Sequence, residues 1–121
     1  MSTWLALLYK MKPGVEEEVT NLFQSSGRPD HEVRDEDGNV VGRLLTTMVF
    51  VGKDAAVRVI EVEGDVRVVA GHISRQGEVK HFEENVEQYL SEPRDLSNPE
   101  GAREFFQRSG MRNVLIRRHD D

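Results

Sequence analysis

The sequence predicts an α+β domain in which strands and helices follow one another in a βαββαβ order. Three observations predict this class: short runs rich in β-branched residues, intervening stretches whose apolar residues recur every three to four positions, and turn signals between them. A chain of 121 residues fits one domain, so residues 1–121 are assigned to a single domain. A domain of this size can form a core without disulfides, which the absence of Cys excludes.

The first half of the chain contains three predicted strands and one helix. The apolar run over residues 4–9 is short and continuous, which is typical of a strand buried on both faces. A helix is predicted over residues 15–24, where apolar side chains form one stripe of a 3.6-residue period. Asp37-Gly38 is the strongest hairpin signal, and it joins a short strand over residues 31–34 to a long one over residues 40–51.

The second half of the chain adds the remaining strands and helices. A strand over residues 56–63 is predicted to run antiparallel to the long strand, and helices over residues 66–75 and 78–90 follow it. Asn98-Pro99 is a typical helix start, and the last strand is predicted over residues 111–117. This order is that of a ferredoxin-like βαββαβ fold with an antiparallel sheet and extra helices.

Both faces of the predicted sheet are apolar. In the long strand, one side carries Leu44, Thr46, Met48 and Phe50, and the other carries Leu45, Thr47, Val49 and Val51. Helices on one side of an antiparallel sheet cover only one of its faces, so the second face needs another cover. A second copy of the chain is the economical cover, and we therefore expect a homodimer that packs sheet against sheet.

Composition and charge exclude several classes of function. The chain has 16 Lys+Arg against 22 Asp+Glu, a net charge of −6, which argues against nucleic acid as a partner. The apolar runs fall far short of the ~20 residues that span a bilayer and no signal peptide is evident, so no membrane association and a cytoplasmic location are expected. The four His lack the spacing of metal ligands, and no nucleotide motif is present, so we expect no metal and no cofactor.

A few charged residues interrupt the apolar strands and are candidates for chemistry. Arg58 and Glu61 lie on opposite sides of the strand over residues 56–63. A charge in such a strand needs a partner or water. Either one of the two faces a barrel cavity and binds a phenolate or carboxylate oxygen there, or the charge forms a salt bridge to a neighbouring strand or to the other subunit. Arg43 and Arg112 are open to the same two interpretations.

His72 is the candidate for acid–base chemistry, because its intrinsic pKa suits proton transfer near neutral pH. The alternative is a helix His that faces solvent. A pocket for a flat ligand would have Arg58, Glu61 or His72 at its polar end. The apolar side chains expected to line this pocket are Trp4, Met48, Phe50 and Phe106. Aromatic residues of a small domain can equally belong to its core.

Four stretches of the sequence, taken in order, resemble one known family. They are Tyr9-x-x-x-Pro13-Gly14-x-Glu16-Glu17, the segments RDEDGNVVGRLL and VRVIEVEGD that begin at Arg34 and Val57, and Glu92-Pro93-Arg94-Asp95 with Asn98-Pro99-Glu100-Gly101. Together they resemble the SchA/CurD-like family over nearly the whole chain. Members of that family are encoded with type II polyketide synthases, in spore-pigment and aromatic polyketide clusters.

The resemblance implies a dimeric α/β barrel, a group that includes cofactor-free monooxygenases of antibiotic biosynthesis. One hypothesis is an enzyme that acts on an aromatic polyketide intermediate, as a polyketide cyclase or a cofactor-free monooxygenase. A second is a non-catalytic accessory subunit that docks on polyketide synthase components or shields the chain. A third is a haem-binding dimeric α/β barrel with His72 as the proximal ligand. No established catalytic residue is carried over by the resemblance.

Overall fold

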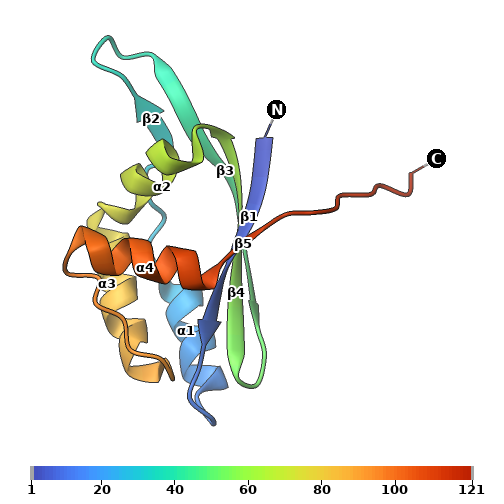
Figure 1. Ribbon diagram of the computed structural model, residues 1–121, viewed down its shortest axis with the longest axis vertical. Coiled ribbons are helices and arrows are strands. Elements are labelled where there is room, and N and C mark those ends of the chain that lie inside the picture. Colours follow the sequence, from blue (N-terminus) through green and yellow to red (C-terminus); the bar gives the residue numbers. More distant parts are fainter. Residues whose placement is uncertain (1, 121) are drawn as a thin grey trace.

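Five strands form one antiparallel sheet in the order β2-β3-β4-β1-β5 (Figure 1). The computed structural model describes residues 2–120. The strands are β1 (Ser2–Lys10), β2 (Glu32–Arg34), β3 (Val40–Val51), β4 (Ala55–Gly64) and β5 (Gly110–Arg112). The predicted α+β class and antiparallel sheet are confirmed. The sheet is that of a ferredoxin-like fold, with β2 added beside β3 at one edge.

The helices all lie on one side of the sheet and leave its other face bare (Figure 1). They are α1 (Glu16–Ser25), α2 (Val66–Ser74), α3 (Gly77–Val86), the 3₁₀ turn η1 (Glu87–Tyr89) and α4 (Pro99–Ser109). The Asp65 carboxylate caps α2 by accepting hydrogen bonds from the amides of Arg67 and Val68. Asn98 caps α4 in the same way through the amide of Gly101.

The core forms two clusters between the sheet and these helices. The larger one is built around Tyr9, Val19, Phe82, Val86 and Phe105, which join β1 to α1, α3 and α4. The smaller cluster contains Val33, Val62 and Val69, which join β2 and β4 to α2. Because side chains of a strand alternate between faces, the buried Leu7 and Tyr9 show which face of β1 meets the helices.

The face turned away from the helices is largely apolar, in line with the sequence pattern, although Glu61 and Thr46 also lie on it. In register across β5, β1, β4 and β3 lie Met111, Ala6, Val59 and Met48. Phe50 on the same face is 59% exposed. Among residues 2–120 no helix combines the length and apolar character needed to cross a bilayer.

Two predicted boundaries are wrong. The last strand pairs with β1 only through Gly110–Arg112, and the chain beyond it leaves the sheet, so residues 113–117 pair with no strand among the described residues 2–120. The helix predicted over residues 78–90 ends at Val86 and continues as the 3₁₀ turn. Leu90 is already extended there, because it forms a bridge with Met11 at the end of β1.

Candidate functional site

A cleft of about 1200 Å³ opens between the sheet and the helices. Strands β1, β3 and β4 contribute Leu7, Val49 and Ile60 to its lining, and the helices contribute aromatic and aliphatic side chains that include Phe23 and Ile73. Both core clusters border the cleft, so the two parts of the core are separated by a space instead of merging. Pockets that hold small ligands are concave and mostly apolar with a few polar groups, and this cleft fits that description.

Arg58 provides a charged group on the β4 side of the cleft. Its side chain is only 17% exposed, and its Nη1 atom lies 3.6 Å from Oε1 of Glu83 on α3. Its guanidinium carbon is 5.0–5.7 Å from the ring centroids of Phe82, Phe23 and Tyr9. Rings at this distance stabilise a cation through their quadrupoles. Arg58 is thus held between an acidic side chain and three aromatic faces.

Arg94 is the second cation of this network, and its side chain is fully buried. It donates hydrogen bonds to Oε2 of Glu83 at 2.7 Å and to Oε1 of Glu87 at 2.9 Å. The guanidinium lies 4.5 Å from the ring centroid of Phe105. Burial by itself lowers the pKa of Arg94, but the two carboxylates outweigh it and raise that pKa above its ordinary value. Arg94 therefore stays charged and fixes Glu83.

Tyr9 completes the network from β1. Its hydroxyl donates a hydrogen bond to Oε1 of Glu83 at 3.0 Å. Burial, reinforced by the nearby Glu83 carboxylate, raises the pKa of Tyr9 well above its ordinary value, so its hydroxyl stays protonated at neutral pH. Glu83 is the centre of the network, since one of its oxygens faces Tyr9 and Arg58 and the other faces Arg94.

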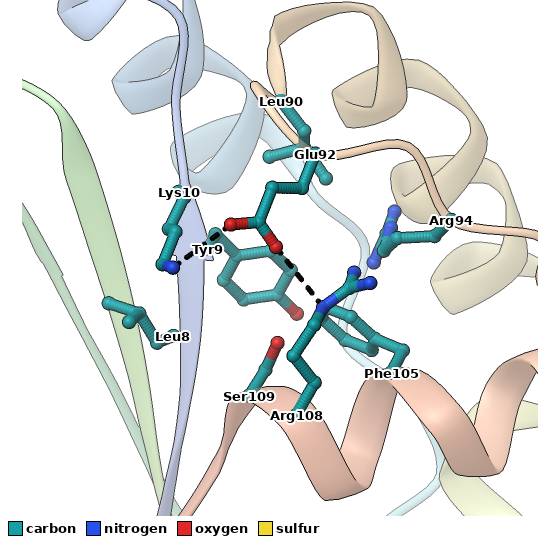
Figure 2. A pocket seen from close by; sticks show the side chains of 9 residues that line it. All are labelled: Leu8, Tyr9, Lys10, Leu90, Glu92, Arg94, Phe105, Arg108 and Ser109. Carbon is teal, nitrogen blue, oxygen red and sulfur yellow. Dashed lines mark hydrogen bonds and ion pairs between the residues drawn. The ribbon is translucent and has the colours of Figure 1, made fainter.

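A small hollow of about 20 Å³ borders the same network and is shown in Figure 2. Glu92 lies across it and pairs with Lys10 at 2.9 Å and with Arg108 at 3.2 Å. Tyr9 and Arg94 also line the hollow (Figure 2). Its volume suits about one water molecule and no larger ligand.

The structure brings only two of the sequence-predicted site residues into the cleft. Arg58 and Phe106 line it, whereas Trp4, Met48 and Phe50 lie on the opposite, bare face of the sheet. The cause is the alternation of side chains along β1 and β3, which sends these three residues away from the helices. The residues predicted to line one pocket therefore lie on two different faces of the sheet.

Glu61, Arg43 and His72 also lie outside the cleft lining. Glu61 is on the bare face, where hydrogen bonds from Ser2 and Thr46 lower its pKa below the ordinary value. Arg43 forms ion pairs with Glu32 and Glu63. The His72 ring has a polar contact with the backbone carbonyl of Asp30. Arg112 is exposed on β5. The functional roles assigned to these residues stay predictions.

The sequence indicates Tyr9 among the aromatic residues that could line a pocket, but sequence reasoning missed Glu83, Glu87 and Arg94 as its partners in one site. One signal was available: Glu83 and Glu87 are four residues apart in a predicted helix, a spacing that puts both carboxylates on one face. Nothing local indicated that Arg94, after the helix, folds back between them. Such a contact depends on the path of the chain between η1 and α4.

The fold and the cleft define a small α+β protein with space for a ligand between sheet and helices. The family model "SchA/CurD like domain" matches residues 2–118, and the chain belongs to this SchA/CurD-like family. Three curated relatives match over 106 residues, or 88% of this chain. They are the "42.8 kDa protein in whiE locus" of Streptomyces coelicolor (39% identical, 25% of that protein covered), "Polyketide synthase CurD" of Streptomyces cyaneus (38%, 28% covered) and "Protein SchA" of Streptomyces halstedii (36%, 27% covered). The chain thus spans about a quarter of the length of these relatives, and no solved structure matches it.

Proposed function

We propose that this domain acts in aromatic polyketide biosynthesis by binding a polyketide intermediate in the cleft and steering its cyclisation or oxidation. One observation carries the proposal: a space of about 1200 Å³ with largely apolar walls and a partly exposed arginine, Arg58, among its charged side chains. Typical small-molecule pockets measure roughly 300–1,000 Å³, so this one is large enough for a molecule of several fused rings. The relative named "Polyketide synthase CurD" supports the choice of ligand class.

Steering requires only that the bound chain is held in one conformation. A poly-β-ketone has many reactive carbons, and the pair that reacts is set by which carbons are held together. Flat aromatic walls such as Phe82 and Phe106 favour the planar arrangement that leads to a ring. Tyr9 and Glu83 are already engaged with each other, which favours steering by shape and charge over proton transfer by these groups.

The haem alternative does not fit the cleft. Its expected ligand, His72, has Nε2 3.1 Å from the carbonyl oxygen of Asp30 and is not among the lining residues. The accessory-subunit alternative differs from the enzyme in stoichiometry. A catalyst changes the product pattern of a polyketide synthase when present well below one copy per synthase, whereas an accessory subunit acts only at one copy or more.

The proposed function is tested with a variant in which a larger side chain fills part of the cleft. The protein is added to a reconstituted polyketide synthase, and the products are separated by chromatography. Ala70→Phe adds a ring inside the cleft from α2 and should abolish the change in product pattern. The matched control is Val68→Phe, which enlarges an exposed residue of the same helix outside the cleft lining and should act like the wild type. An Ala70→Phe variant as effective as the wild type would refute the proposal.

We further propose that a second copy of the chain covers the bare face of the sheet. The row Met111, Ala6, Val59 and Met48, with Phe50 beside it, gives an apolar surface that a two-fold axis would place against itself. Light scattering at micromolar concentration should give twice 13.8 kDa. Phe50→Glu should give the single-chain mass while far-UV circular dichroism stays unchanged. A wild-type mass of 13.8 kDa would refute this arrangement.

A further inference from the structure

We infer that the ligand of the cleft is held through an ionised oxygen, a phenolate, an enolate or a carboxylate, by the guanidinium of Arg58. The inference rests on the proposed function and adds the charge state of the ligand. Its basis is a contrast between the two arginines of the network, Arg94, which is buried, and Arg58, which is partly exposed. Arg94 directs three of its N–H groups to Glu83 and Glu87. Among residues 2–120, Arg58 has no such set of acceptors.

Several N–H donors of Arg58 are not used within the protein. Among residues 2–120 its polar side-chain contact is with Glu83, and this distance of 3.6 Å is longer than a hydrogen bond. A guanidinium carries five N–H donors. Among residues 2–120, every side-chain nitrogen or oxygen that is fully buried has a hydrogen-bond partner, so the unpaired nitrogens of Arg58 are accessible to solvent. Because Arg58 lines the cleft, we infer that its free donors face the cleft. An acceptor brought by a ligand would complete what the protein leaves unpaired.

The surroundings of Arg58 favour an ionised acceptor over a neutral one. Rings of Phe23, Phe82 and Tyr9 lie within 5.7 Å of its guanidinium carbon and reduce its contact with water. Hydrogen bonds between charged partners are about twice as strong as neutral ones, and a low local dielectric strengthens them further. Glu83 does not neutralise Arg58 fully, because the Glu83 carboxylate also accepts hydrogen bonds from Arg94 and Tyr9.

The ionisable groups that face Arg58 are Glu83 from α3 and Tyr9 from β1, with Arg94 on the far side of Glu83. Tyr9 stays protonated through neutral pH because burial raises its pKa. The wider cleft also carries charged or titratable side chains that are unchanged in every variant below, so their contributions cancel in the comparison; they are Arg28, His31, Glu78, Lys80, Glu84, Glu87 and Asp95. A change in the absorption of the bound ligand between pH 5 and 10 that depends on Arg58 therefore reports the ionisation of the ligand itself.

The probes are a hydroxyanthraquinone with one ionisable phenol and its methyl ether, which has the same rings but cannot ionise. Ionisation is followed by the visible absorption of the phenolate, with and without saturating protein. We expect the wild type to bind the phenolate roughly 10- to 100-fold more tightly than the phenol, which lowers the pKa of the bound phenol by about 1 to 2. Above the pKa of the free phenol, where the probe is ionised both free and bound, the same factor should separate the two probes in affinity.

Two variants assign the effect to Arg58. Arg58→Gln should remove the lowering of the ligand pKa and make the two probes bind equally, while Arg67→Gln, which removes an exposed arginine of α2 outside the cleft lining, should keep both effects. Thermal unfolding shows whether Arg58→Gln is folded. If it is not, the wild-type titration and the methyl ether decide, because they need no variant.

The outcomes separate this inference from the proposed function. If both probes bind with equal affinity and the ligand pKa is unchanged, the inference is overturned and the cleft still binds flat aromatic molecules. If Arg58→Gln lowers the ligand pKa as the wild type does, the inference is overturned as well. If neither probe binds at any pH between 5 and 10, the proposed function itself is overturned together with the inference.

Discussion

Replacing Arg94 by methionine should destabilise the domain strongly, because it removes a fully buried cation and leaves its carboxylate partners behind. The change keeps much of the apolar volume over the Phe105 ring but removes the contacts with Glu83 at 2.7 Å and Glu87 at 2.9 Å. Glu83 is 16% exposed and cannot regain full hydration. It would keep the hydrogen bond from Tyr9 and the weaker contact with Arg58.

The size of the loss follows from these remaining partners. Breaking a buried ion pair by removing one partner costs about 3–5 kcal/mol. Glu83 stays partly compensated, and Glu87 is 35% exposed and can turn to water, so we expect about 3 kcal/mol in the free energy of unfolding. For a domain of this length about 1 kcal/mol corresponds to roughly 4 °C, and the expected fall in Tm is therefore about 12 °C.

Arg108→Met is the matched control. Arg108 also lies over the Phe105 ring, at 5.9 Å, but it is 39% exposed, and within the described part of the chain its ion pair is with Glu92 alone. An exposed pair of this kind contributes about 1 kcal/mol or less. Urea and thermal unfolding at pH 7, followed by far-UV circular dichroism, measure both variants. Equal losses, or a loss below about 1 kcal/mol for Arg94→Met, would refute the view that the network holds the cleft together.

Three further predictions concern the frame of the site. Gly101→Ala should destabilise the domain by about 1–3 kcal/mol in urea unfolding, because an added Cβ would overlap the carbonyl oxygen of Asp95; an unchanged midpoint would contradict this close approach. Asp65→Ala removes the cap of α2 and should cost about 1 kcal/mol, whereas Asp65→Asn, which can still cap, should cost less. The pKa of Glu61 is lowered in the folded state, so its stabilising contribution is present above the unfolded-state pKa and is lost as pH falls through the folded-state value. Unfolding measured between pH 7 and pH 3 should therefore show a shallower acid decline in Glu61→Gln than in the wild type; identical declines would contradict it.

The faces of the strands could be predicted from the sequence, but not which face meets the helices. Alternation along β4 places Arg58 and Glu61 on opposite sides, and the register confirms this. A strand with one polar face shows its orientation directly, whereas both faces of β3 are apolar, so the pattern carries no such information. The sequence pattern therefore places Met48 and Phe50 in the pocket, whereas they lie on the bare face.

The charged network of the cleft could not be predicted from the sequence, for a different reason. Glu83 has the sequence context of a solvated helix residue, and it becomes buried only because Arg94 returns to it from beyond η1. Local patterns report which side a residue occupies on its own element. They do not report which charged side chains a loop will bring to it, and the burial of a charge depends on that partner.

At the end of the described chain, too, the local sequence does not show whether a strand finds a partner. Residues 111–117 have a strand-like composition, yet only Gly110–Arg112 pairs with β1, opposite Leu5–Leu7. Val114, Leu115 and Ile116 are 81%, 61% and 62% exposed, and the segment runs away from the helices (Figure 1). β-propensity describes how well a side chain fits a pleated surface, but a strand also needs an edge within reach. The segment that carries them extends on the side of the sheet away from the helices, where the proposed second copy would lie (Figure 1). Exposed apolar residues are therefore found both on the bare face and on the segment that leaves it.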